Sequence, residues 1–132
     1  MNTRENVACE GPELAATRAE VLARVEDILA LLARNAERAE AERDLAPESF
    51  EALVDSGALR LFAPRRAGGY EAGYRTYVEV TLLLARACGS SAWLSFILNH
   101  GDWQTGHLAA AAQVQVWPEG AGATAKVAVP LS

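Results

Sequence analysis

The sequence has few of the residues that build disulfides or metal sites. Among 132 residues there are two cysteines, Cys9 and Cys88, and two histidines, and no C-x-x-C pair is present. Cys9 lies in a polar N-terminal stretch and Cys88 in an apolar segment, so we expect two reduced thiols and no disulfide. The same scarcity predicts that the chain binds no metal.

Lysine and long apolar runs are also scarce. Lys126 is the only lysine, and the net charge is -5 at pH 7. An acidic chain is a poor general nucleic-acid binder. The apolar runs 78–84 and 93–98 are too short to span a bilayer, and residues 1–10 have no apolar core of a secretory signal. We therefore expect a cytoplasmic protein without a membrane or nucleic-acid partner.

Two short motifs do not have the context of a cofactor or nucleophile site. The Gly68-Gly69 pair is not part of a G-x-G-x-x-G or Walker pattern. We expect it to form a tight turn that fixes Tyr70 and Glu71. The serines at 90–91 are not part of a G-x-S-x-G elbow, and helix capping explains them.

The residues that are present are typical of one all-α domain, with 51% hydrophobic content. Apolar residues recur at three- and four-residue steps from Leu14 to Leu32, which predicts a long helix with one buried stripe. The charged stretch 36–44 should fray or end that helix. Pro47 and Gly57 are placed to begin and to cap a short second helix.

Two later segments are apolar on most faces. Residues 74–88 predict a central helix buried nearly all round, and 93–103 predict a fourth helix, N-capped by a serine of the 90–91 pair. A fifth helix is expected within 106–117. Because the connections are short, neighbouring helices should pack antiparallel.

The domain plan is a flexible tail over 1–11, a helical domain over 12–118 and a C-terminal tail over 119–132 with a short strand stub. The third and fourth helices carry more apolar surface than the other helices can cover. We therefore predict a homodimer related by a two-fold axis.

His100 is the strongest candidate for chemistry. An imidazole can act as a general base near neutral pH, and His100 shares a helix face with Gln104. The alternative is a core histidine that binds a backbone carbonyl. Asp102 is two residues away and cannot share the face of His100, so we interpret it as the cap of a helix that restarts after Gly101.

The remaining candidates are arginine and aromatic side chains. Arg65 or Arg66 could clamp a carboxylate or stabilise an enolate-like charge, although loop arginines are as often merely solvated. Trp93 and Trp103 would form pocket walls, or else core. The predicted catalytic residues are His100 and Arg66, and the predicted substrate contacts are Arg65, Tyr70, Trp93, Phe96, Trp103 and Gln104.

The stretch 64–103 combines a basic turn, a glycine pair, an apolar helix, a glycine–serine corner and an aromatic helix with one histidine. This order resembles the N-terminal helical domain of the acyl-CoA dehydrogenase superfamily, and within it the flavin-dependent monooxygenases that hydroxylate phenols. The resemblance extends over residues 14–117 and implies that His100 lines a substrate pocket. It also implies that the flavin is held by later domains, so we expect no cofactor on this chain alone.

Three functions follow from these observations. The first is a cofactor-free tailoring enzyme of bacterial natural-product biosynthesis. Concretely, it would form lysinoalanine by adding a lysine amine to dehydroalanine in a lanthipeptide of the cinnamycin or duramycin type, with His100 moving the proton. The second is a split or degenerate flavin-monooxygenase-like subunit that needs a flavin-binding partner. The third is a non-catalytic helical module for binding or dimerisation.

Overall fold

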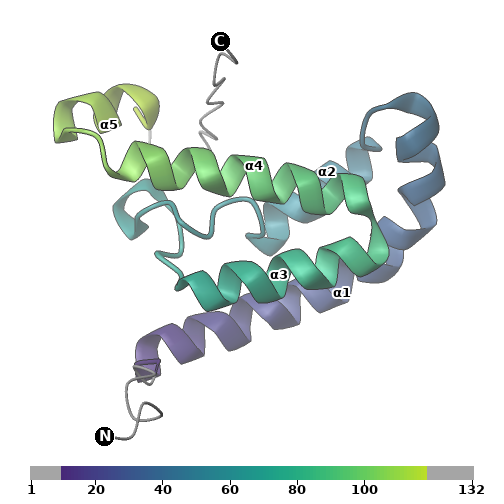
Figure 1. The fold of residues 1–132 in the computed structure, drawn as a ribbon, viewed down its shortest axis with the longest axis horizontal. Coiled ribbons are helices and arrows are strands. Elements are labelled where there is room, and N and C mark those ends of the chain that lie inside the picture. The colour runs from purple at the N-terminus through teal and green to yellow at the C-terminus, as the bar shows by residue number, and fades with distance from the viewer. Residues whose placement is uncertain (1–9, 119–132) are drawn as a thin grey trace, which may run out of the picture.

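The computed structural model describes residues 10–118, and these residues form an all-α fold, as predicted. The strand stub expected near 126–131 lies outside the described residues. Within residues 10–118, five α-helices and one 3₁₀ turn follow each other (Figure 1). Their bounds are α1 (Pro12–Glu42), α2 (Pro47–Ser56), the 3₁₀ turn (Arg65–Ala67), α3 (Tyr74–Ala87), α4 (Gly89–Gly106) and α5 (Ala110–Val116).

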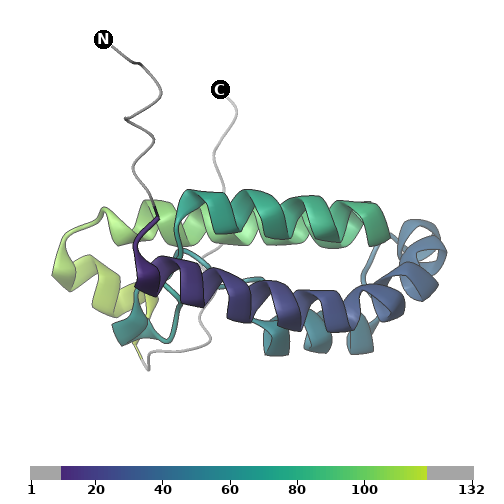
Figure 2. The same ribbon diagram turned by 90° about the horizontal axis from the view of Figure 1, so that it is seen from below.

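The helices are arranged in two layers. α3 and α4 form an antiparallel pair, and α1 packs mainly alongside α3 and against α2 (Figures 1 and 2). The antiparallel expectation holds for the successive helices α3 and α4. α1 and α3 instead run in the same direction, because the segment 57–73 carries the chain back to the start of α1. An ion pair of 3.4 Å between Arg18 and Glu79 joins the two helices there.

α1 continues through the stretch that we expected to fray. Its last turns are rich in alanine and glutamate, which are good helix formers. Arg38 and Glu42 form an i,i+4 ion pair of 3.1 Å. Ala39 is buried, and Asn35 Nδ2 donates a hydrogen bond to Ser49 Oγ at 2.9 Å. Tertiary contacts with α2 therefore hold α1 together until Arg43 adopts a left-handed conformation (φ 54°).

Apolar packing positions the helices more than capping does. None of the five helices in the described part of the chain has a side-chain hydrogen bond at its N-cap. Such a bond contributes about 1 kcal/mol, whereas burying one large aliphatic side chain contributes about 1.5–3 kcal/mol. The largest fully buried aliphatic side chains are Val21, Val25, Leu32, Leu53, Leu59, Leu61, Val80 and Leu84.

Two predictions about α4 are wrong. The helix begins at Gly89, with Cys88 as its N-cap, so both serines of the 90–91 pair lie inside the first turn and neither caps it. The helix also continues through Gly101 without a restart, and Asp102 is fully buried within it. A single glycine costs a helix about 1 kcal/mol, which the packing of α4 offsets.

The prediction that α3 is buried nearly all round is also wrong. Thr76, Tyr77 and Val80 are buried, but Tyr74 is 71% exposed and Leu82 is 56% exposed. α1 and α4 cover two sides of α3, and nothing in residues 10–118 covers the third. The apolar outer side of α3 therefore continues the exposed surface of α4.

Candidate functional site

Buried hydrogen bonds fix the rotation of α4 about its own axis. Ser95 Oγ and Asn99 Nδ2 each donate to the carbonyl oxygen of Ala58 at 2.8 Å. Asn99 Oδ1 accepts the N–H of Leu61 at 2.7 Å. Ser95 and Asn99 are fully buried, where such bonds are strong and costly to lose. One face of α4 is thus held against the segment after α2, and the opposite face must point outward.

The outward face carries a continuous line of rings, which we call the aromatic row: Trp93, Phe96, His100, Trp103 and His107. Successive ring centroids lie 5.7, 5.8, 5.8 and 4.5 Å apart along the row. Trp93 is 65% exposed and Trp103 is 48% exposed, and His100 is exposed between its neighbours. The alternatives that placed His100 and these tryptophans in the core are therefore wrong.

α3 adds a buried phenol beside the row. The ring of Tyr77 lies 6.1 Å from that of Phe96 and 4.9 Å from that of Phe62. Burial raises the pKa of the Tyr77 hydroxyl, and the neighbouring Tyr74 raises it further. The phenol therefore stays protonated at neutral pH. Its oxygen has no hydrogen-bond partner among the described residues, so a donor group is left unused beside Phe96.

A hollow of about 460 Å³ opens at the far end of the row, and we call it the row hollow. The guanidinium of Arg66 lines it and donates to Gln113 Oε1. Gln113 is buried and is held in turn by the carbonyl oxygens of Leu108 (2.7 Å) and Gly106 (3.1 Å). The row hollow is lined by Phe62, Pro64, Arg66, Glu71, Ala72, Tyr74, Trp103, Gly106 and His107.

The structure thus brings most of the predicted site residues together. Trp93, Phe96, His100 and Trp103 share the aromatic row, and Arg66 lies in the hollow that Trp103 also lines. Gln104 follows His100 by one helical turn and is half-buried. His107 and Tyr74 also belong to this cluster but were not predicted. The i,i+4 spacing of Trp103 and His107 was the signal that could have found His107.

Two predicted substrate contacts point elsewhere. Arg65 reaches α1, where it pairs with Glu13 at 3.1 Å and donates to Thr17 Oγ1 at 3.3 Å. The hydroxyl of Tyr70 accepts a hydrogen bond of 2.8 Å from Arg24, and its ring lies where a Cβ of Gly57 would be. Both side chains tie the 57–73 segment to other elements, and neither lines the row hollow.

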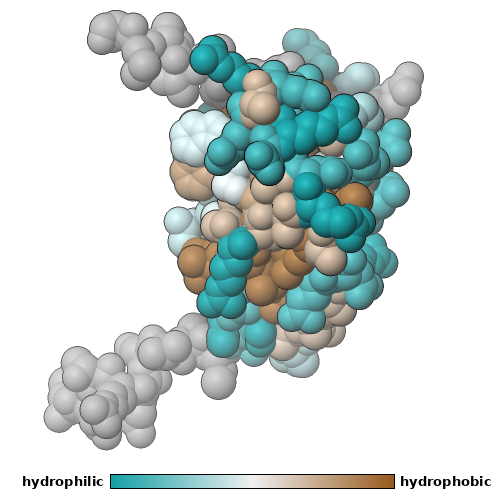
Figure 3. Space-filling view, turned by 90° about the vertical axis from the view of Figure 1, so that its right-hand side faces the viewer, coloured by the Kyte–Doolittle hydropathy of each residue, from teal (hydrophilic) through white to brown (hydrophobic). Residues whose placement is uncertain are grey.

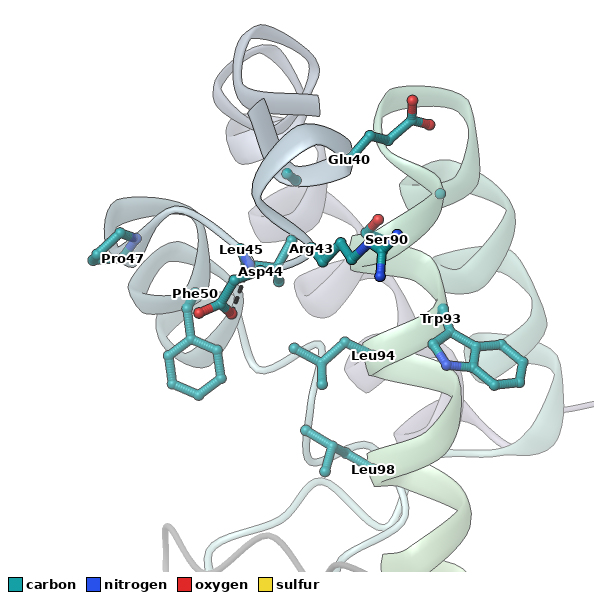
Figure 4. Close-up of a pocket in the computed structure, with 12 residues that line it drawn as sticks. Glu40, Arg43, Asp44, Leu45, Pro47, Phe50, Ser90, Trp93, Leu94 and Leu98 are labelled. Atoms are coloured by element: carbon teal, nitrogen blue, oxygen red, sulfur yellow. Dashed lines mark hydrogen bonds between the residues drawn. The ribbon is translucent and has the colours of Figure 1, made fainter. Parts of the chain in front are cut away.

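A second hollow of about 920 Å³, the end groove, lies where α1 ends and α2 and α4 begin (Figure 4). Phe50 of α2 faces Leu94 and Leu98 of α4 across it, and Arg43 reaches toward Ser90. No sequence pattern predicted this groove, because only the fold joins its two segments. Its lining residues are Ala39, Glu40, Arg43, Asp44, Leu45, Pro47, Phe50, Gly89, Ser90, Trp93, Leu94 and Leu98.

Two further kinds of site are absent from residues 10–118. No cluster of three or more histidine, cysteine, aspartate or glutamate side chains could hold a metal ion there. None of the helices in this range has the length and apolarity needed to cross a membrane.

Comparison with known proteins identifies a family and several relatives of this helical domain. Residues 11–118 match the family model of the acyl-CoA dehydrogenase N-terminal domain. The chain is 32% identical over 94 residues to the flavin-dependent monooxygenase oxygenase subunit HsaA of Rhodococcus jostii, a match that covers 71% of this chain and 25% of that protein. It is 29% identical over 109 residues to the p-hydroxyphenylacetate 3-hydroxylase oxygenase component of Acinetobacter baumannii, covering 83% of this chain and 26% of that one.

The crystal structure of the HsaA monooxygenase from M. tuberculosis is similar in fold, with a TM-score of 0.73 and 32% identity. That match covers 77% of this chain and 28% of the enzyme. The chain therefore spans about a quarter of the length of the relatives that it matches. With the family model matching residues 11–118 and the fold agreeing, the chain belongs to the acyl-CoA dehydrogenase N-terminal domain family.

Proposed function

We propose that this chain supplies the N-terminal helical part of a flavin-dependent oxygenase that hydroxylates a phenolic ring. The aromatic row and the row hollow form one wall of the substrate site. A separate flavin-binding domain or subunit, which we call the covering body, packs over that wall. The observation that carries the proposal is the exposed aromatic row with His100 at its centre, in a chain whose relatives are monooxygenase oxygenase components.

The residues of this chain do not fit a flavin by themselves. Binding a flavin requires a deep apolar slot for its ring system and cationic or N–H groups for its phosphate. In the row hollow, Arg66 is the one arginine of the lining, and the carboxylate of Glu71 belongs to the same lining. In the end groove, Glu40 and Asp44 outnumber Arg43. We therefore assign the flavin to the covering body.

His100 handles the substrate proton in this proposal. A phenol becomes a better nucleophile when its O–H proton is removed, and an exposed imidazole can accept that proton near neutral pH. Phe96 and Trp103 flank the imidazole and offer faces for the substrate ring. Arg66, which lines the adjoining row hollow, stabilises the negative charge that develops on the substrate oxygen.

The outer side of α3 supports a covering body. Tyr74 is 71% exposed and Leu82 is 56% exposed there, and a covering body would remove both side chains from water.

A chimeric oxygenase tests the proposal. Residues 10–118 replace the matching N-terminal segment of the A. baumannii oxygenase component, and hydroxylation of p-hydroxyphenylacetate is measured with reduced flavin and oxygen supplied. We expect product to form. In the chimera, His100→Ala should lower kcat by about 100-fold or more. Arg34→Ala, on the exposed side of α1, should leave kcat within about twofold and serves as the control.

Several outcomes would contradict the proposal. A folded chimera that binds flavin but forms no product would favour the non-catalytic helical module. Unchanged kcat in His100→Ala would remove His100 from the mechanism. Tight flavin binding by the 132-residue chain alone would contradict the assignment of the flavin to the covering body. The relatives support this flavin-dependent function better than the expected lysinoalanine formation, because they are monooxygenase oxygenase components.

A further inference from the structure

The row hollow and the end groove differ in the groups that line them. Apolar side chains such as Phe50 and Leu94 form much of the end groove. Figure 3, which faces that end of the molecule, shows a hydrophobic patch bordered by hydrophilic side chains. The row hollow, at the other end of α4, combines aromatic rings with Arg66, Glu71 and His107. Because a few polar groups decide which ligand a pocket accepts, the row hollow is the more selective of the two.

The imidazole of His107 is held in one orientation at the end of α4. Its Nδ1 lies 2.7 Å from the carbonyl oxygen of Trp103, and the two ring centroids lie 4.5 Å apart. A carbonyl oxygen can only accept a hydrogen bond, so Nδ1 carries the hydrogen. In the neutral imidazole, Nε2 then keeps its lone pair and can accept a hydrogen bond. His107 therefore supplies an oriented acceptor to the lining of the row hollow.

The charged groups of the row hollow favour a neutral partner for this acceptor. The positive charge of Arg66 and the negative charge of Glu71 belong to the same lining. An ammonium group there would be repelled by Arg66. A carboxylate would be repelled by Glu71, and it has no hydrogen to donate to Nε2 of His107. A hydroxyl group is neutral and can donate, so it fits the acceptor without opposing either charge.

We propose that the row hollow selects phenols that carry a second hydroxyl group, and that this hydroxyl donates a hydrogen bond to Nε2 of His107. This role rests on the proposed function, in which His100 takes the proton of the first hydroxyl. His107 follows His100 by two helical turns, or about 10.5 Å along the axis of α4. Trp103 lies between the two imidazoles, with its ring centroid 5.8 Å from that of His100. With hydrogen bonds of about 2.8 Å at each end, the two oxygens lie about 5 Å apart, on opposite sides of one aromatic ring.

Titration of the full 132-residue chain with three phenols that differ only in their para group tests this role of His107. The phenols are 1,4-dihydroxybenzene, 4-methylphenol and 4-hydroxybenzoate, added without oxygen up to about 10 mM while the imidazole nitrogen NMR signals are followed. We expect 1,4-dihydroxybenzene to shift the Nε2 signal of His107 and to bind at least about fivefold more tightly than 4-methylphenol, because only its second hydroxyl can donate there. 4-Hydroxybenzoate should bind no more tightly than 4-methylphenol.

Two variants of His107 separate the hydrogen bond from ring packing. His107→Phe keeps a ring against Trp103 but removes Nε2, so 1,4-dihydroxybenzene and 4-methylphenol should bind equally. His107→Gln keeps an acceptor oxygen and should retain part of the preference. Leu108→Ala is the matched control, because Leu108 is 49% exposed beside His107 but does not line the row hollow. It should keep the wild-type preference, and thermal melts check that all three variants are folded.

Either of two results would overturn the role of His107. One is a wild-type chain that binds neither neutral phenol, or binds both equally. The other is a preference for 1,4-dihydroxybenzene that survives in His107→Phe. If the chimera forms product but either result is found, the proposed function stands without a second hydroxyl. If the chimera is inactive but the preference depends on His107, the proposed function fails and the row hollow remains a hydroxyl-binding site.

Discussion

At the scale of single residues, Asn99 has the largest structural role on α4. Its side chain bridges the backbone of Ala58 and Leu61, in a position with no access to water. Asn99 lies one residue before His100 in the sequence, which places the two side chains about 100° apart around the helix, one buried and one exposed. The buried amide therefore determines where the exposed imidazole points.

Asn99→Ala should destabilise the chain by about 2–4 kcal/mol, because the Leu61 N–H and the Ala58 carbonyl each lose a buried partner. Such a loss is a large part of a typical stability of about 5–15 kcal/mol. Urea unfolding followed by circular dichroism measures it. Gln104→Ala, at a half-buried position of the same helix, should cost less than about 1 kcal/mol. Similar losses in both variants would contradict the role given to Asn99.

At the scale of elements, the segment 57–73 decides how the helices meet. It folds back on itself through hydrogen bonds from Tyr70 N–H to Arg60 O (3.1 Å) and from Ala72 N–H to Leu61 O (2.8 Å). Gly68 adopts a positive φ of 80°. Gly69 approaches the backbone of Ala63 so closely that a Cβ would collide with its carbonyl. The predicted tight turn is present, and it explains both glycines.

Gly69→Ala should therefore destabilise the chain by about 1–3 kcal/mol or more, since the Ala63 carbonyl has to move. That movement also disturbs the hydrogen bond of 3.1 Å that the carbonyl accepts from the Glu71 N–H. Gly106→Ala is the control, because a Cβ there meets open space. It should be neutral or slightly stabilising. The melting temperatures of both variants give the comparison. An unchanged melting temperature in Gly69→Ala would show that the Ala63 carbonyl can move at little cost.

At the scale of the whole molecule, unfolding should depend on pH through the junction of α1 and α3. The hydrogen bond from Arg75 lowers the pKa of Glu79 below its ordinary value of 4.5, and the charge of Arg18 lowers it further, against the opposing effect of burial. A carboxylate with a lowered pKa stabilises the folded state at pH values above its unfolded pKa. That stabilisation is lost as the pH falls through the folded pKa.

Melting temperatures measured from pH 7 down to pH 3 should therefore fall below about pH 4.5, and Glu79→Gln should have a shallower acid limb than wild type. At pH 7 the variant should be modestly less stable, since partly exposed ion pairs contribute little. Glu51→Gln, an exposed carboxylate on α2, should keep the wild-type slope. Parallel curves for Glu79→Gln and wild type would assign the acid dependence to other groups.

The sequence determined the order of the helices and their approximate positions, because apolar periodicity and proline and glycine boundaries are local features. It could also place Trp93, Phe96, His100 and Trp103 on one helix segment. It could not show which side of α4 faces water. Ser95 and Asn99 look like ordinary polar points in an apolar helix, and only Ala58 and Leu61, about forty residues earlier, give them a buried role.

Only the tertiary structure decided three further points. It turned Arg65 and Tyr70 toward α1, it left one side of α3 uncovered, and it joined the end of α1 with the start of α4 in the end groove. Each depends on contacts between residues that are distant in the sequence. Periodicity records which residues of a helix are apolar, but the partner that packs against them determines which apolar residues are buried. For His100, the packing of α4 and not the sequence pattern determines that the side chain is exposed in the aromatic row.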